Sequence, residues 1–179
     1  MKVALINSVQ DAAGLNIRHH IERLLEEDPR GWGETGREYA FFETACRLIH
    51  AEHADVAIDA DLVIFLSRHA SENPVPVLTV HVTGNFGNAG LGGMPRTLAP
   101  AAAGMMQATL RALAKHCPEG YRVSYEVTHH GPTGLSHPSF FVEIGSTEAE
   151  WSDPVAGKAV AESVLSAAPQ HPVPLIGFG

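Results

Sequence analysis

The chain has 179 residues, of which 45% are hydrophobic and 18% are charged, as in an ordinary soluble globular protein. Its formal net charge of −8 argues against a generally basic surface that coats nucleic acid, although a local basic patch remains open. No apolar run approaches the roughly 20 residues of a membrane span, and the N-terminal run is too short for a signal peptide. We therefore predict a cytoplasmic protein that does not bind membranes.

The two cysteines, Cys46 and Cys117, lie far apart in the sequence. A Cys-x-x-Cys pair is absent, which excludes a zinc knuckle built on thiolates. In a reducing compartment we expect two free thiols rather than a disulfide.

In the first half of the chain, short apolar runs alternate with one amphipathic segment. Apolar residues at helical spacing predict a helix over residues 12–25. One proline and three glycines predict a loop over residues 28–36. The apolar runs predict strands over residues 2–7, 39–44, 62–66 and 77–82.

The second half begins with residues 83–96, which contain five glycines and predict a long loop of functional type. Helices are expected over residues 98–117 and, with Asp153 as cap, over 154–167. A short helix begins at Thr147, whose spacing from Glu150 matches a capping box. Strands are expected over residues 121–128, 139–144 and 173–176. The alternation predicts one α/β domain over residues 1–179, with a mostly parallel mixed sheet and flanking helices.

Histidines follow three of the predicted strands. His69 follows the predicted strand over residues 62–66, and His81 lies near the end of the strand over 77–82. His129 and His130 follow the strand over 121–128. In an open α/β sheet, ligands bind at the carboxyl ends of strands, so we expect His69 and His81 at one rim. Imidazole binds zinc and titrates near neutral pH, so metal ligation and acid–base catalysis are both open for these residues.

His129 and His130 are neighbours, and neighbouring side chains of a strand point to opposite faces. Extending the alternation of residues 121–128 favours His130 at the open polar rim, with His129 packed beneath it.

Glu143 lies within the apolar run 140–144. A carboxylate in a buried strand needs a partner or stays protonated, and a metal, an arginine or a histidine would meet that need. We expect Glu143 to belong to a site, since the alternative is an edge strand on which it faces water.

The loop around Gly84 and Gly87 exposes backbone N–H groups that suit a phosphate or an oxyanion, but it matches no P-loop or dinucleotide fingerprint. Ser67 and Ser71 lack the frame of a nucleophile elbow, so we do not expect a serine nucleophile. Apolar packing accounts best for Trp151 and the methionine pair 105–106.

Several sequence blocks together resemble the archaeal- and plant-type D-aminoacyl-tRNA deacylases. The most specific are Ser-Arg-His-Ala-Ser at residues 67–71 and Thr-His-His-Gly-Pro-Thr at residues 128–133. The matching blocks are residues 64–71, 78–81 with 84–85, 126–133, 141–147 with Trp151, and 176–179. Members of this family usually continue past the last block, so we expect the chain to lack the usual C-terminal part.

The resemblance implies hydrolysis of the ester that joins a D-amino acid to the 3′-terminal ribose of tRNA. It also implies zinc as a cofactor and a fold related to peptidyl-tRNA hydrolases and nucleoside phosphorylases. We expect His69, His81 and His130 to act as zinc ligands or bases, and Glu143 to orient one of them. The expected contacts with the tRNA 3′ end are Ser67, Arg68, Gly84, Asn85, Gly87, His129, Gly131 and Thr133.

Two other functions stay open from the sequence. One is a metal-dependent hydrolase or a phosphorylase-like enzyme that acts on a small substrate. The other is a protein that binds the tRNA 3′ end without turnover. The sequence leaves monomer and homodimer equally open.

Overall fold

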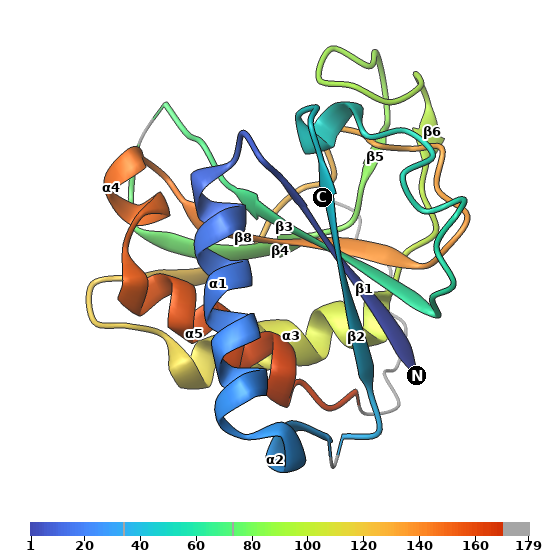
Figure 1. Cartoon of the computed structure of the whole chain (residues 1–179). Coiled ribbons are helices and arrows are strands. Elements are labelled where there is room, and N and C mark those ends of the chain that lie inside the picture. Colours follow the sequence, from blue (N-terminus) through green and yellow to red (C-terminus); the bar gives the residue numbers. More distant parts are fainter. Residues whose placement is uncertain (34, 73, 170–179) are drawn as a thin grey trace.

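A six-stranded mixed sheet runs through the middle of the molecule (Figure 1). The structure is a computed structural model, and it describes residues 1–33, 35–72 and 74–169. The strands of this sheet are β1 (Lys2–Ser8), β2 (Glu38–Thr44), β3 (Leu62–Arg68), β4 (Val77–His81), β7 (Arg122–Tyr125) and β8 (Ser139–Gly145). Two shorter strands, β5 (Gly84–Asn85) and β6 (Thr97–Leu98), pair with each other outside it.

The order of the main sheet is β2-β1-β3-β8-β4-β7. Strands β2, β1, β3 and β8 are parallel, β4 runs antiparallel to β8, and β7 is parallel to β4. The predicted mostly parallel mixed sheet is therefore confirmed. Because β4 runs antiparallel to β8, these two neighbouring strands end at opposite edges of the sheet.

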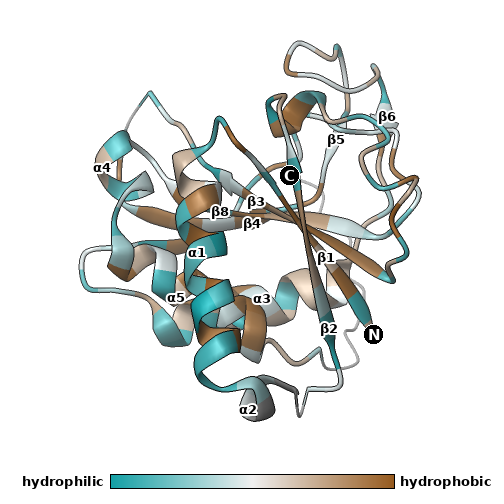
Figure 2. Ribbon diagram, viewed as in Figure 1, coloured by the Kyte–Doolittle hydropathy of each residue, from teal (hydrophilic) through white to brown (hydrophobic). Residues whose placement is uncertain are grey.

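The helices lie on one face of the sheet, and loops cover the other. The helices are α1 (Ala12–Glu27), α2 (Pro29–Gly33), α3 (Ala103–His116), α4 (Glu148–Trp151) and α5 (Pro154–Ser166), with a 3₁₀ turn η1 (Leu48–His50). The core beneath α1, α3 and α5 includes Leu5, Leu66 and Val142, all inaccessible to solvent. A smaller core on the loop-covered face contains Phe65 and Phe141. The central strands are correspondingly hydrophobic in Figure 2.

Local sequence signals account for where the main helices begin. The Asp11 side chain accepts a hydrogen bond from Gly14 N at 3.0 Å and caps α1, and Asp153 caps α5 by accepting from Val155 N at 2.8 Å. Glu150 accepts from the backbone N–H of Thr147 at 2.8 Å, as the predicted capping-box spacing requires.

Some expected boundaries are wrong. Residues 28–36 contain the short helix α2 rather than only loop. Helix α3 begins at Ala103, not at residue 98, because residues 97–98 form β6 and pair with β5. The strand expected over 121–128 ends at Tyr125. The strand expected over 173–176 lies outside the described residues.

The expectations for the thiols, the methionine pair and Trp151 are met. Cys46 and Cys117 are free thiols. Met105 is buried in the core beneath the helices, with Met106 and Trp151 packed against it. None of the described helices is both long enough and apolar enough to cross a bilayer.

Candidate active site

Three neighbouring strands place a row of polar side chains on the loop-covered face of the sheet. In the strand register, Ser67 of β3 lies beside Glu143 of β8, and Glu143 lies beside Thr79 of β4. The Thr79 hydroxyl donates to Glu143 Oε2 at 3.4 Å. Glu143 is only 3% exposed, which excludes the alternative of an edge strand facing water.

The next row of the same face is aromatic and supports the polar row. Phe65 stacks on Phe141 with ring centroids 4.6 Å apart, and His81 stacks on the other side of Phe141 at 5.2 Å. Side chains two residues apart on a strand share a face. The alternation of each strand therefore places the His81 ring beside the Glu143 carboxylate.

His69 follows the end of β3 and lies over Gly145 of β8. A Cβ atom at Gly145 would lie 2.6 Å from His69 Cδ2, so only glycine leaves room for the imidazole there. The carbonyl of His69 accepts a hydrogen bond from Trp151 Nε1 at 2.9 Å. Trp151 therefore supports the candidate site as well as the core.

Two glutamates face His69. Its Nδ1 lies 2.9 Å from Glu126 Oε1 and 3.9 Å from Glu143 Oε2. Contact with Glu126 outweighs burial and raises the pKa of His69. Burial opposes ionisation of Glu126, but the contacts with His69 and Thr79 lower its pKa to about 2. Glu126 is therefore a carboxylate at neutral pH.

Glu143 has the opposite tendency. Burial raises its pKa, against the effect of nearby His81, whose Nε2 lies 3.6 Å from Glu143 Oε2. Burial also disfavours the charged form of His81, but Glu143 outweighs this and raises the His81 pKa. Even so, His81 Nε2 is a buried polar atom without a hydrogen-bond partner among the described residues. Such an atom is costly to bury unless it binds something else.

Three imidazoles form a cluster next to this carboxylate pair. The rings of His81, His129 and His130 lie 4.6–5.3 Å apart, and one nitrogen of each lies within 4.8 Å of the others. In each ring Nδ1 contacts a backbone carbonyl. For His81 this is the carbonyl of Val82 at 3.1 Å. For His129 it is that of Val127 and for His130 that of Gly131, both at 2.6 Å. A carbonyl only accepts hydrogen bonds, so Nδ1 of each ring carries a proton, and in the neutral form of the ring Nε2 keeps its lone pair for a ligand.

His130 is held in this neutral form. Burial and the neighbouring His81 lower its pKa to about 3. A neutral imidazole with a free lone pair is the form that binds a metal ion. The second group of residues with metal-ligand geometry consists of His69, Glu126 and Glu143.

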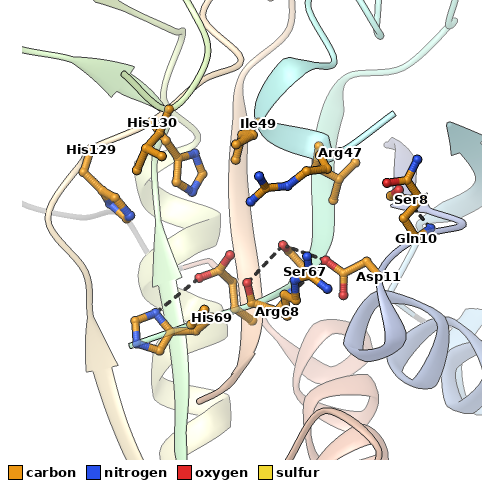
Figure 3. Close-up of a pocket in the computed structure, with 14 residues that line it drawn as sticks. Ser8, Gln10, Asp11, Arg47, Ile49, Ser67, Arg68, His69, His129 and His130 are labelled. Atoms are coloured by element: carbon orange, nitrogen blue, oxygen red, sulfur yellow. Dashed lines mark hydrogen bonds and ion pairs between the residues drawn. The ribbon is translucent and has the colours of Figure 1, made fainter. Parts of the chain in front are cut away.

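A cavity of about 140 Å³ opens beside the two groups (Figure 3). His69, His129, His130 and Glu143 line one part of it, whereas His81 is buried and is not among the lining residues. The remaining lining residues come from the segment after β1, from the η1 region, from the end of β3 and from the glycine-rich loop: Ser8, Gln10, Asp11, Arg47, Leu48, Ile49, Ser67, Arg68, Ala70 and Leu91.

The structure thus brings six of the predicted site residues to one cavity: Ser67, Arg68, His69, His129, His130 and Glu143. Five other predicted site residues do not line the cavity: Gly84, Asn85, Gly87, Gly131 and Thr133. The Asn85 amide donates to the carbonyl of Gly92 at 2.9 Å. Thr133 Oγ1 accepts from the backbone N–H of Met94 at 2.8 Å.

The idea that backbone N–H groups of this loop stabilise an oxyanion meets a direct obstacle at Gly84. Its N–H donates to the carbonyl of His130 at 2.8 Å and is not available to a ligand. A Cβ atom at Gly131 would lie 2.4 Å from Gly93 N, so Gly131 serves the close approach of two backbone segments.

Two geometric expectations are wrong. His69 and His81 do not follow neighbouring parallel strands, because β8 lies between β3 and β4 and β4 runs the other way. They meet across Glu143 on the face of the sheet. The assignment within the histidine pair is reversed, since His130 is buried and His129 exposed. Strand alternation does not apply to either, because β7 ends at Tyr125.

Sequence reasoning missed three residues of the site. Glu126 follows the last residue of β7 and reads as a surface glutamate of an alternating strand. Asp11 is recognisable as a helix cap, but its contacts with Ser67 Oγ at 3.3 Å and Arg68 N at 3.1 Å are tertiary. Arg47 carries no local signal.

Clustered imidazoles and buried carboxylates beside a cavity form a site with the geometry to hold a metal ion and to transfer protons. The sequence profile of the D-aminoacyl-tRNA deacylases matches residues 56–179. The chain therefore belongs to the D-aminoacyl-tRNA deacylase family.

Curated relatives agree with this assignment. The chain is 72% identical over 179 residues to the D-aminoacyl-tRNA deacylase of Methanoregula boonei and 59% identical to that of Methanoculleus marisnigri. In both cases all of this chain is covered, and it spans 41% of the relative's length.

Solved structures support the fold. A crystal structure of AF0625, a conserved protein of unknown function, superimposes with a TM-score of 0.83 at 36% identity, covering 93% of this chain and 62% of that one. The catalytic domain of an N-acetylmuramoyl-L-alanine amidase from Paenibacillus polymyxa gives a TM-score of 0.53 at 13% identity, covering 92% of this chain and 94% of that one. The second likeness concerns the fold alone.

Proposed function

We propose that the chain hydrolyses the ester between a D-amino acid and the 3′-terminal ribose of tRNA, in the cytoplasm, with zinc as cofactor. One observation carries the proposal beyond family membership. Three histidines whose Nδ1 atoms contact backbone carbonyls each bring one ring nitrogen within 4.8 Å of the others, close to His69, which faces the ionised Glu126. Ester hydrolysis needs an activated water molecule, and these are groups that can activate it.

The donor set suits a zinc ion. His81, His129 and His130 would hold it, because their Nδ1 protons are already donated to backbone carbonyls. The unpartnered Nε2 of His81 supports this assignment. Glu143 Oε2 lies 3.9 Å from His69 Nδ1 and is proposed to help orient His69. When bound, zinc would lower the pKa of water to about 7 and polarise the ester carbonyl.

His69 is the proposed general base. Its Nδ1 faces the Glu126 carboxylate, which orients the ring and favours the imidazolium that forms when the other nitrogen takes a proton from water. The same proton can then pass to the ribose oxygen as the ester bond breaks. Ser67 and Arg68 line the cavity beside this histidine and are proposed to contact the tRNA 3′ end.

Discrimination between enantiomers has to come from shape, because the D and L substrates carry the same groups. A preference of ~10⁴ corresponds to about 5.5 kcal/mol of differential binding in the transition state, more than one methylene contact supplies. The walls of the cavity beside His69 are the surfaces that can exclude the L side chain.

The test is deacylation of matched D- and L-tyrosyl-tRNA by the purified chain with zinc supplied. We expect rapid loss of the D ester while the L ester is spared. If the D ester is not cleaved, this chain is not a deacylase. Equal cleavage of both esters would instead define a general esterase.

A further inference from the structure

Two arginines line the cavity on the side away from the histidine cluster. Arg47 precedes η1 and is exposed, and Arg68 is the last residue of β3 and half-buried. Neither guanidinium forms an ion pair with a carboxylate in the described part of the chain. In Figure 3 the Arg47 guanidinium projects toward the space between His130 and Ser67.

Arg68 is held in place from two sides. Its guanidinium carbon lies 5.0 Å from the ring centroid of Trp151. Its backbone N–H donates to Asp11 Oδ2 at 3.1 Å. Stacking on an aromatic face restrains a guanidinium while leaving its N–H edge available to a ligand.

The acidic groups that line the cavity, Asp11 and Glu143, form no ion pair with these arginines. Asp11 uses one oxygen to cap α1 and the other to accept from Ser67 and from the backbone of Arg68. Glu143 lies between His69 and His81. The arginine side of the cavity therefore has two guanidinium groups that form no ion pair with the described carboxylates, near the Asp11 carboxylate that caps α1.

We propose that Arg47 and Arg68 form an anion subsite for the phosphodiester that joins the terminal adenosine of the substrate to the rest of the tRNA. This inference rests on the proposed function, since it assumes that the scissile ester lies at the histidine cluster. The phosphodiester is then the nearest anion of the tRNA to the ester, one ribose away. Guanidinium groups match phosphate oxygens in pairs, and two of them suit one phosphate.

The test measures binding without turnover. Adenosine 5′-monophosphate and adenosine are titrated calorimetrically into the full chain with zinc supplied. The ratio of their dissociation constants reports the contribution of the phosphate. We expect the monophosphate to bind on the order of tenfold more tightly or better, as one charge-assisted contact supplies about that factor. In Arg47→Ala and Arg68→Ala the ratio should fall toward one.

Arg23→Ala is the matched control. Arg23 is an exposed arginine of α1 that pairs with Glu27 at 2.7 Å, away from the cavity, so the ratio should stay at the wild-type value. Arg47 is exposed and its removal leaves the core untouched, which keeps the test valid if Arg68→Ala folds poorly. Arg68→Lys retains the charge without the paired N–H groups, and we expect an intermediate ratio.

A wild-type ratio near one would overturn the subsite. A ratio retained in both alanine variants would also overturn it, because the phosphate would then bind elsewhere, for example at zinc. D-Tyrosine tests the other anion, the product carboxylate. If both variants weaken D-tyrosine and leave the monophosphate unaffected, the arginines hold the product and the phosphate assignment is wrong. Failure to cleave D-tyrosyl-tRNA with the phosphate preference intact counts against the proposed function alone.

Discussion

Two pairings of histidine with buried carboxylate, near opposite ends of β8, differ in how many ionisable groups they bring together. Before the strand, Asp55 Oδ2 accepts from the backbone N–H groups of Ser136 and His137, each at 2.7 Å, and lies 2.9 Å from His137 Nδ1. Toward the end of the strand, Glu143 faces two histidines at 3.6 and 3.9 Å.

The difference teaches how to separate a structural pair from a functional one. At Asp55 one carboxylate oxygen collects three donors and ties a loop to the start of β8, while Oδ1 has no hydrogen-bond partner among the described residues. Around Glu143, two carboxylates and four imidazoles crowd together, and His81 Nε2 lacks a hydrogen-bond partner within the described residues. Several ionisable groups crowded together in a buried place detract from stability, so this crowding points to a ligand or a reaction.

The sharpest test of this comparison replaces one histidine of each pairing by glutamine. In His69→Gln we expect kcat/KM for D-tyrosyl-tRNA to fall on the order of 10²–10⁴-fold, because the proposed general base is lost. The free energy of unfolding should stay near that of the wild type. His137→Gln is the matched variant, with normal deacylation. Equal loss of activity in both variants would remove the distinction.

The carboxylates should differ in stability. Asp55→Ala removes the buried carboxylate that three partly exposed donors share, and we expect the free energy of unfolding to fall by about 2 kcal/mol in urea titrations. Glu143→Gln removes a carboxyl group whose burial already raises its pKa, so stability should be unchanged or higher. A large destabilisation by Glu143→Gln would make that cluster structural.

Zinc affinity should follow the histidine cluster. His129→Ala removes a proposed ligand from an exposed position, so the fold should survive while zinc affinity falls by about 100-fold or more, as measured by competition with a chelator. His137→Gln should bind zinc as the wild type does. Wild-type affinity in His129→Ala would shift the assignment to the group of His69, Glu126 and Glu143.

The smallest expected effect is the pH dependence of stability. Burial opposes ionisation of Asp55, but the donors from His137 and Ser136 outweigh it and lower its pKa. A carboxyl group with a lowered folded-state pKa stabilises the protein above its ordinary pKa of about 3.9, and that stabilisation disappears as the pH falls through the folded-state value. The stability difference between wild type and Asp55→Asn should therefore shrink on acidification. A difference that grows would contradict the sign.

Most of the fold could be predicted from the sequence because its signals are local. Hydrophobic runs located β1, β3 and β8, and capping residues located the starts of α4 and α5. The direction of β4 could not be predicted, because a run of apolar residues has no polarity and the segment after His69 permits either orientation. The proximity of His69 and His81 was consequently expected for the wrong reason.

The candidate site was predictable where function required unusual residues. A glutamate in an apolar strand and histidines at strand ends stand out against their surroundings. Glu126 and Arg47 do not, because a charged residue next to an exposed strand end or turn is ordinary. Only the tertiary structure brings them to the cavity. Gly145 could not be recognised from the sequence either, because it must be glycine only where the ring of His69 lies over it.

The most direct test of the central claim is to titrate zinc into the metal-free chain while following deacylation of D-tyrosyl-tRNA. The account predicts a rate that rises from background and saturates at about one zinc ion per chain, with no such rise in His129→Ala. Full activity in the metal-free chain, insensitive to added zinc, would contradict it.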